Sequence, residues 1–145
     1  MFPEVDYDFE EEEILEQETV ATTICRTPLY DFKQGRYVVV DGKIKECTQE
    51  EAVRQWVGFL VKTAAEKYDV YRDTDFGTYI ENYIGYKDDA FVASEIKREI
   101  EESAVSNRAI AAIEDFDFVR EGDKMKISLT VVMQTGDEVE VETDV

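Results

Sequence analysis

The side chains of this chain that could do chemistry are mostly carboxylates, with 35 Asp and Glu residues and no histidine. Two carboxyl groups can hydrolyse a glycosidic bond when they face each other across the sugar and one has a raised pKa. With so many acidic residues, however, pairs also arise by chance. Serine and cysteine nucleophiles lack the histidine that usually activates them. We therefore expect no catalytic residues and no cofactor, and a peptidoglycan-degrading, lysozyme-like activity is the alternative to a structural role.

A calcium loop is the other chemistry that the acidic residues could support. Asp69, Asp73 and Asp75 surround a turn and loosely resemble the start of such a loop. The acidic framework before a glycine and the closing glutamate that calcium requires are missing. Phosphate-binding glycine loops and zinc-ligand spacings are absent as well. The sequence therefore predicts no metal site.

The charge of the chain limits its partners. A net charge of −19 should repel nucleic acid and anionic membranes, and basic proteins are the natural counterparts. A decoy that binds basic proteins in place of nucleic acid is a further possibility. No apolar run approaches the ~20 residues that a bilayer needs, and the N-terminus is acidic where a signal peptide is basic. We expect a protein made in a cytoplasm.

The length of 145 residues predicts one domain that follows an acidic arm. The arm carries nine acidic residues and no basic one. Because like charges repel, it either stays solvated or docks through the apolar residues that alternate with its acids. The expected divisions are an arm at 1–18 and a domain at 19–145, made of a strand and hairpin extension (19–47), a helical part (48–105) and a β-meander (108–145).

A hairpin and a first helix follow the arm. Asp41–Gly42 suits a type I′ turn, which predicts a hairpin over 37–46. Thr48 and Glu51 form a capping box that predicts the start of a helix. The core stripe of that helix is expected at Ala52, Val53, Trp56, Phe59, Leu60 and Ala64.

Two further helices are expected before the meander. Tyr79 to Ile84 suggests a helix of two turns that Gly85 would end in a left-handed cap. A third helix begins at about Asp89, and Ser106–Asn107 breaks it. Its buried face is expected at Val92, Ile96, Ile100 and Ala104.

The last part of the chain, Arg108 to Val145, predicts three antiparallel strands joined by glycine turns. Helices that precede a meander, without regular βαβ alternation, indicate an α+β domain with three helices packed on the sheet. In the final strand, Glu138–Val139–Glu140–Val141–Glu142, valines should line one face and glutamates the other. Its free edge either is blunted by the glutamates or accepts a partner strand.

From about Glu50 to Val145, the chain resembles the sheath-initiator baseplate proteins of contractile phage tails and related injection machines. The resemblance is to the XkdS-like branch from prophages of Gram-positive bacteria. It lies in the order of the elements and in two local matches. Asp75–Phe76–Gly77 before a short helix looks like a step that the family carries there. Ser106–Asn107–Arg108 stands where the family generally has Glu-Pro-Arg, so only the arginine matches.

The resemblance implies a non-enzymatic baseplate part in a virion or phage-tail-like particle, assembled in the host cytoplasm. Such initiators surround the tail tube near the hub, in six copies. They offer their sheet to arms of the first sheath subunits, which add strands to it. Other baseplate wedge proteins are the remaining partners implied. The interface residues would be Arg108, toward the wedge proteins, and Glu138, Val139, Glu140, Val141 and Glu142, toward the sheath arm.

Overall fold

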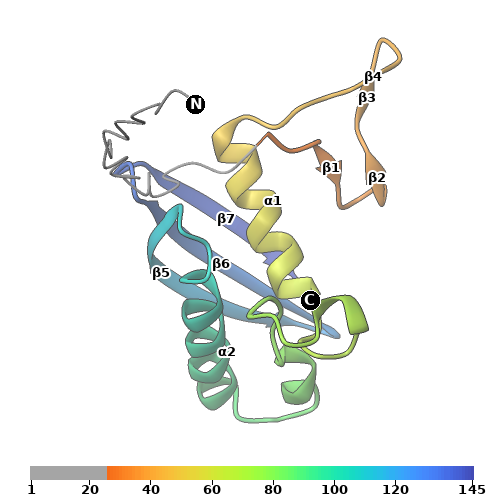
Figure 1. Cartoon of the computed structure of the whole chain (residues 1–145). Coiled ribbons are helices and arrows are strands. Elements are labelled where there is room, and N and C mark those ends of the chain that lie inside the picture. The colour runs from red at the N-terminus through yellow and green to blue at the C-terminus, as the bar shows by residue number, and fades with distance from the viewer. Residues whose placement is uncertain (1–25) are drawn as a thin grey trace, which may run out of the picture.

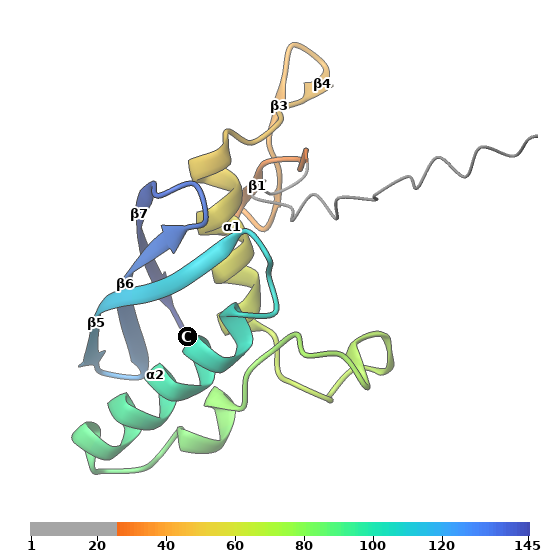
Figure 2. The ribbon, with the colours of Figure 1, turned by 60° about the vertical axis from the view of Figure 1, so that its left-hand side comes forward.

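The structure is a computed structural model, and it describes residues 26–145. Two α-helices pack on one face of a three-stranded antiparallel sheet, and two short hairpins project beside the first helix (Figures 1 and 2). The acidic arm 1–18 and the strand expected directly after it lie outside the described residues. The elements are β1 (Tyr30–Asp31), β2 (Arg36–Tyr37), β3 (Val39–Val40), β4 (Lys43–Ile44), α1 (Gln49–Lys62), η1 (Asp69–Tyr71), η2 (Ile80–Tyr83), α2 (Asp89–Ala104), β5 (Ile110–Glu121), β6 (Lys124–Met133) and β7 (Glu138–Asp144).

Helix α1 begins at the predicted capping box. The Thr48 hydroxyl accepts a hydrogen bond from the Glu51 backbone N–H at 3.2 Å, and the Glu51 carboxylate accepts one from the Thr48 N–H at 2.9 Å. Both bonds satisfy N–H groups that have no partner inside the helix. The buried face differs from the predicted stripe: Val57 and Val61 also lie in the core, whereas Trp56 and Ala64 are only partly buried and Ala64 lies beyond the end of the helix. Phe59 is only partly buried and instead contacts the ring of Phe32 in the hairpin extension, with ring centroids 4.9 Å apart.

Helix α2 agrees with its prediction at both the cap and the core. The Asp88 carboxylate accepts a hydrogen bond from the Phe91 N–H at 3.1 Å and caps the first turn. Residues four apart then face the sheet, as helical periodicity requires. The buried residues of this face are Val92, Ile96, Ile100 and Ala104.

The predicted count of three helices is wrong, since the described residues contain two α-helices. The expected middle helix is a single 3-10 turn, η2. Its hydrogen bonds run from Asn82 N–H to Tyr79 O and from Ile84 N–H to Glu81 O, and no side chain caps its start. Gly85, at a φ of 95°, then turns the chain away. One uncapped turn before a left-handed glycine is too short to form an α-helix.

A buried carboxylate holds η2 in place. Glu99 of α2 accepts hydrogen bonds from the Tyr79 backbone N–H at 2.6 Å and from the Tyr83 hydroxyl at 3.1 Å. Burial and the hydrogen bond to Glu99 raise the pKa of Tyr83. The position of η2 is therefore fixed by hydrogen bonds to α2 and not by helix formation within the segment itself.

The C-terminal meander is present as predicted. Strand β6 is central and pairs with β5 on one side and with β7 on the other. Gly122 and Gly136 occupy the two turns with positive φ. Strand β5 is irregular, because its register shifts between Glu114 and Asp117, where Asp115 has a φ of 49°. This extra residue is a β-bulge, which bends the strand locally.

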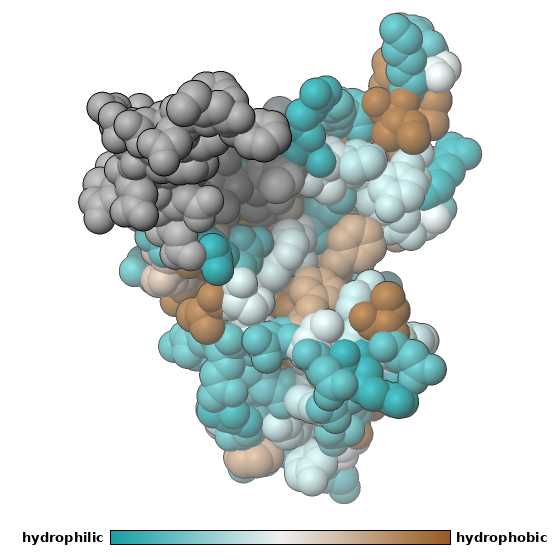
Figure 3. All heavy atoms as spheres, in the orientation of Figure 1, coloured by the Kyte–Doolittle hydropathy of each residue, from teal (hydrophilic) through white to brown (hydrophobic). Residues whose placement is uncertain are grey.

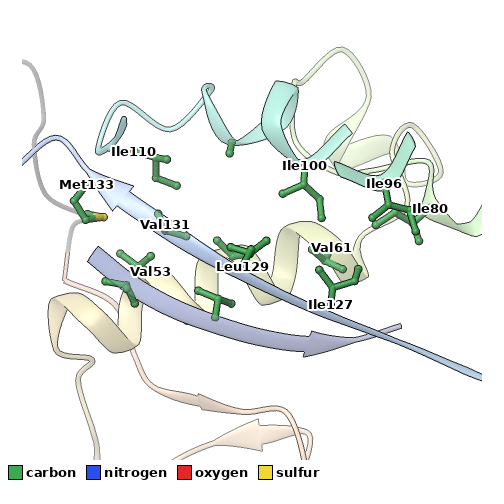
Figure 4. Close-up of a cluster of buried hydrophobic side chains, with 14 of the residues drawn as sticks. Val53, Val61, Ile80, Ile96, Ile100, Ile110, Ile127, Leu129, Val131 and Met133 are labelled. Atoms are coloured by element: carbon green, nitrogen blue, oxygen red, sulfur yellow. The ribbon is translucent and has the colours of Figure 1, made fainter. Parts of the chain in front are cut away.

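The hydrophobic core lies between this sheet and the two helices (Figure 4). Alternate residues of β6 point toward the helices, as the two-residue period of a strand requires. Val139 and Val141 of β7 are buried on the same face, whereas the glutamates between them are exposed, so the predicted alternation is confirmed. The buried residues of β6 are Met125, Ile127, Leu129, Val131 and Met133.

One amide and one glycine of α1 hold the hairpin extension. The buried Gln55 side chain donates to the Pro28 carbonyl at 2.9 Å and accepts from the Tyr30 N–H at 2.7 Å. It thus bonds the backbone as a neighbouring strand would. Gly58 lies against Phe32, and a Cβ at this position would come within 2.9 Å of the ring. Any larger residue there would displace the extension.

Candidate strand-accepting edge

The last strand has a free edge that is defined by its register with β6. Met125 and Val145 exchange two backbone hydrogen bonds, at 2.9 and 3.0 Å. Bonded pairs alternate along an antiparallel ladder, so Val139 and Val141 also bond β6. The N–H and C=O groups of Glu138, Glu140 and Glu142 therefore point away from the sheet. Within residues 26–145, none of these three N–H groups donates a hydrogen bond.

Two basic residues of α1 already bond carbonyls of this edge. Arg54 Nε donates to the Glu140 carbonyl at 2.9 Å, and Lys62 Nζ donates to the Asp144 carbonyl at 3.0 Å. Both side chains are partly exposed. The Glu142 carbonyl, which lies between them, accepts no bond from the described residues. The edge is thus partly covered by side chains that can move away without unfolding the helix.

A groove of about 320 Å³ lies beside the C-terminal end of β7, at Glu142 to Asp144. One wall is the hairpin extension at Tyr30 and Phe32, and the other includes Glu142 and Asp144. The floor is α1, which contributes Gly58 among other residues. A strand needs about 4.8 Å beside its neighbour, so this hollow lies where an added strand would run.

Asp144 marks the C-terminal end of the groove with a charge cluster. Its carboxylate lies 3.1 Å from Lys62 Nζ and 3.5 Å from Lys124 Nζ. The hydrogen bond from Lys62 is the main cause that lowers the pKa of Asp144, and Lys124 adds to it. The lowered pKa favours the charged carboxylate, which bonds both lysines at this end.

Comparison with known proteins identifies the kind of molecule that carries this edge. Residues 26–137 match the family described as contractile injection system sheath initiator. The chain is also 32% identical over 136 residues to the phage-like element PBSX protein XkdS of Bacillus subtilis strain 168. That alignment covers 92% of this chain and 89% of the relative.

The chain belongs to the sheath-initiator family. As a sheath initiator it is a structural component of a phage-tail-like contractile machine. The match confirms the family resemblance that the order of elements predicted, including the XkdS-like branch. Within the described residues no cluster of His, Cys, Asp or Glu is arranged to hold a metal ion. No helix of this part is long and apolar enough to span a membrane.

The initiator's predicted interface residues lie on two separate parts of the domain. Arg108 is exposed in the loop between α2 and β5 and makes no hydrogen bond or ion pair with the described residues. Glu138 to Glu142 form β7, on the far side of β6 from β5. The structure therefore does not bring the two predicted contacts together, and they would face different partners.

The Phe76–Gly77 step of the initiator is structural. Gly77 has a φ of 113°, and a Cβ there would meet the backbone of Ala65 at 3.0 Å. The next residue, Thr78, donates its N–H to the Thr63 carbonyl at 2.9 Å. Phe76 packs near the ring of Trp56, with centroids 5.8 Å apart. The motif thus ties the loop after α1 back onto the end of that helix.

Sequence reasoning missed Arg54 and Lys62. They are the two basic residues of α1, and each directly follows a buried valine, Val53 or Val61. That position beside the apolar stripe is the signal that could have placed them at the border of the sheet. The sequence does not show which strand lies there, because strand order is set by long-range pairing.

Proposed function

We propose that this protein is a non-enzymatic baseplate component that starts sheath assembly by accepting an arm of a sheath subunit as a strand beside β7. The observation that carries the proposal is the row of outward-facing N–H groups at Glu138, Glu140 and Glu142. An extended peptide can pair with such an edge through its backbone. The groove at the C-terminal end of β7 offers space for it beside Glu142.

The charge of this strand specifies the kind of arm. Glu138, Glu140 and Glu142 expose their carboxylates on the face opposite the core. An added strand whose outward residues are basic would face them as cross-strand pairs, each worth roughly 0.2–1 kcal/mol. An acidic arm would be repelled by similar amounts. We therefore propose a basic arm, in agreement with the charge of the chain as a whole.

Arg108 is proposed as the contact to other baseplate wedge proteins, on the opposite side of the sheet from β7. Its exposed guanidinium can bind a carboxylate or backbone carbonyls through parallel hydrogen bonds. In this arrangement six copies surround the tail tube near the hub, inside a virion or phage-tail-like particle that assembles in the host cytoplasm. No nucleic acid, membrane or cofactor takes part.

A peptidoglycan-degrading activity receives no support from the site. Among the described residues, the carboxyl groups with shifted pKa values are Glu95 and Asp144, and both values are lowered, chiefly by hydrogen bonds from Arg98 and Lys62. A general acid for glycoside hydrolysis needs a raised pKa instead.

The test replaces one outward N–H of β7. Glu142→Pro removes that donor, whereas Glu142→Ala keeps it and removes the same carboxylate. Proline is tolerated on an edge strand, so both variants should fold. Prolines at Val139 or Val141 would break bonds to β6 and are unsuitable.

We expect particles with Glu142→Pro to lack sheaths in electron micrographs and those with Glu142→Ala to carry them. Thermal unfolding by circular dichroism controls for folding of both variants. Sheaths of normal number and length on folded Glu142→Pro would contradict the proposal.

A further inference from the structure

The tip of the hairpin β3–β4 exposes an apolar surface that the domain leaves uncovered. Val39 and Ile44 are 59% and 58% exposed and pair on one face of the hairpin. The tip projects away from the sheet and the helices, and Figure 3 shows hydrophobic residues gathered on it. A two-stranded hairpin is marginally stable alone in water, so a covering partner would stabilise it.

The extension that bears this tip is basic, in contrast to the rest of the chain. Five basic residues and two acidic ones lie between Arg26 and Lys45, in a protein with 35 acidic and 16 basic residues. Lys43 has no ion pair with the described residues, and Arg36 bonds only the amide of Gln34 at 2.9 Å. Lys43 pairs with Val40, so it lies on the face of the hairpin opposite Val39 and Ile44. A strand that pairs along the hairpin would meet one apolar face and one basic face, so a suitable partner alternates acidic with apolar residues.

We propose that the hairpin tip is the docking surface for the acidic segment Glu4–Glu10 of a second copy of this chain. In this segment Val5, Tyr7 and Phe9 alternate strictly with acidic residues. In an extended conformation its apolar side chains share one face and its carboxylates the other. Paired along the hairpin, the segment would place its apolar side chains on the face of Val39 and Ile44 and its carboxylates on the face of Lys43, in the basic extension that also holds Arg36.

Charge favours a second copy over the same chain as the donor of this segment. The residues from Glu10 to Glu18 are mostly acidic, and like charges favour an extended connection over one that folds back. A segment that leaves one copy and binds the hairpin of the next makes a head-to-tail contact. Such contacts close into rings when the rotation between copies allows it.

The test measures the mass of the full chain by sedimentation equilibrium over a range of concentrations. The ionic strength should be physiological, because the Debye length is then about 8 Å and repulsion between the acidic domains is screened. We expect the mean mass to rise with concentration. Val39→Ser/Ile44→Ser on the tip, or Val5→Ser/Tyr7→Ser/Phe9→Ser on the segment, should each weaken the association at least about tenfold, since several cross-strand contacts are lost.

The matched control is Val70→Ser/Ile84→Ser, which removes two apolar side chains that are 76% and 61% exposed elsewhere on the domain. It should leave the association unchanged. A mixture of the tip variant and the segment variant should form pairs but nothing larger, since each retains one intact half of the contact. A wild-type chain that stays monomeric, or a control that weakens association as much as the tip variant, would overturn the proposal without bearing on strand addition at β7.

The charges give a second measurement. Arg36→Glu/Lys43→Glu should weaken association, and Glu4→Lys/Asp6→Lys/Asp8→Lys on the other copy should restore it in a mixture. Failure of the reversed pair to associate while both variants remain folded would also overturn the proposal.

Discussion

The two edges of the C-terminal sheet differ in how they are finished. On β7 the outward carbonyls of Glu140 and Asp144 are bonded by Arg54 and Lys62, and a groove adjoins the C-terminal end of the strand. On β5 a single long hydrogen bond from a side chain of the described residues, from Gln134 to the Ile110 carbonyl at 3.4 Å, lies at the start of the strand, and a bulge at Asp115 interrupts the register. The edge of β7 is thus regular, and movable side chains bond two of its carbonyls. The edge of β5 is bent by a bulge and largely lacks such side-chain bonds.

This difference shows that two kinds of protection act on the same sheet. A bulge is built into the backbone and disturbs any incoming strand at that point. A lysine or arginine on an edge carbonyl is a rotamer that an incoming strand can displace. We therefore expect the added strand at β7, where side chains that can move away cover the edge, and not at β5.

A proline on the outer edge of β5 tests the difference between the two edges most directly. The register leaves the N–H of Ile113 pointing away from β6, and Ile113→Pro removes it while Ile113→Ala keeps it. We expect both variants to support sheath assembly, counted as sheathed particles in electron micrographs. If Ile113→Pro alone abolished sheaths while Glu142→Pro did not, the roles of the two edges would be reversed.

Removing Arg54, one of the two side chains that cover the edge of β7, tests the same difference. Arg54→Ala frees the Glu140 carbonyl and should lower the free energy of unfolding by about 0.5–1.5 kcal/mol, the net value of one hydrogen bond. A strand would then no longer have to displace the guanidinium, so a basic peptide from a sheath arm should bind about 2–10 times more tightly.

Calorimetric titration of that peptide and urea unfolding measure the two effects of Arg54→Ala. Arg98→Ala, which removes an arginine on the exposed side of α2, is the control and should leave peptide binding unchanged. Equal binding by the wild type and Arg54→Ala would show that the side chain is not an obstacle.

The smallest expected effect is the pH dependence at the end of β7. The pKa of Asp144 is lowered in the folded chain, so its ion pair stabilises the fold above the ordinary value of 3.8 and the contribution is lost as pH falls through the folded value. The pair is half exposed, so its loss should cost well under about 1 kcal/mol. Asp144→Asn should remove this part of the acid dependence of unfolding, and a curve unchanged by the substitution would contradict it.

The sequence predicted those parts of the fold that local signals determine. The capping box at Thr48, the turn at Asp41–Gly42 and the alternation in β7 are set by neighbours in the chain, and all are present. The predicted helix at Tyr79 to Ile84 failed because the Tyr79 backbone N–H and the Tyr83 hydroxyl donate to Glu99, a residue far away in the sequence. Arg54 and Lys62 were missed for the same reason, since the carbonyls they bond lie more than eighty positions away.

The docking roles of β7 and Arg108 were predicted from the family resemblance and not from the periodicity of the sequence. An open edge is compatible with an inert strand or with a docking strand, and no pattern within Glu138–Glu142 separates them. Arg108 is also an ordinary exposed arginine by its surroundings. Its proposed contact depends on a partner surface that is absent from this chain.

Helix α1 joins the two proposed docking surfaces. On one side Gln55 and Gly58 seat the hairpin extension, and on the other Arg54 and Lys62 reach β7. Lys62 also lies over the ring of Phe32, 5.4 Å from its centroid. A single side chain therefore contacts both the end of β7 and the extension that bears the hairpin tip. On the two proposals above, α1 would set the distance between a neighbouring copy and the added strand, so a larger residue at Gly58, which would press on the Phe32 ring, should change that distance.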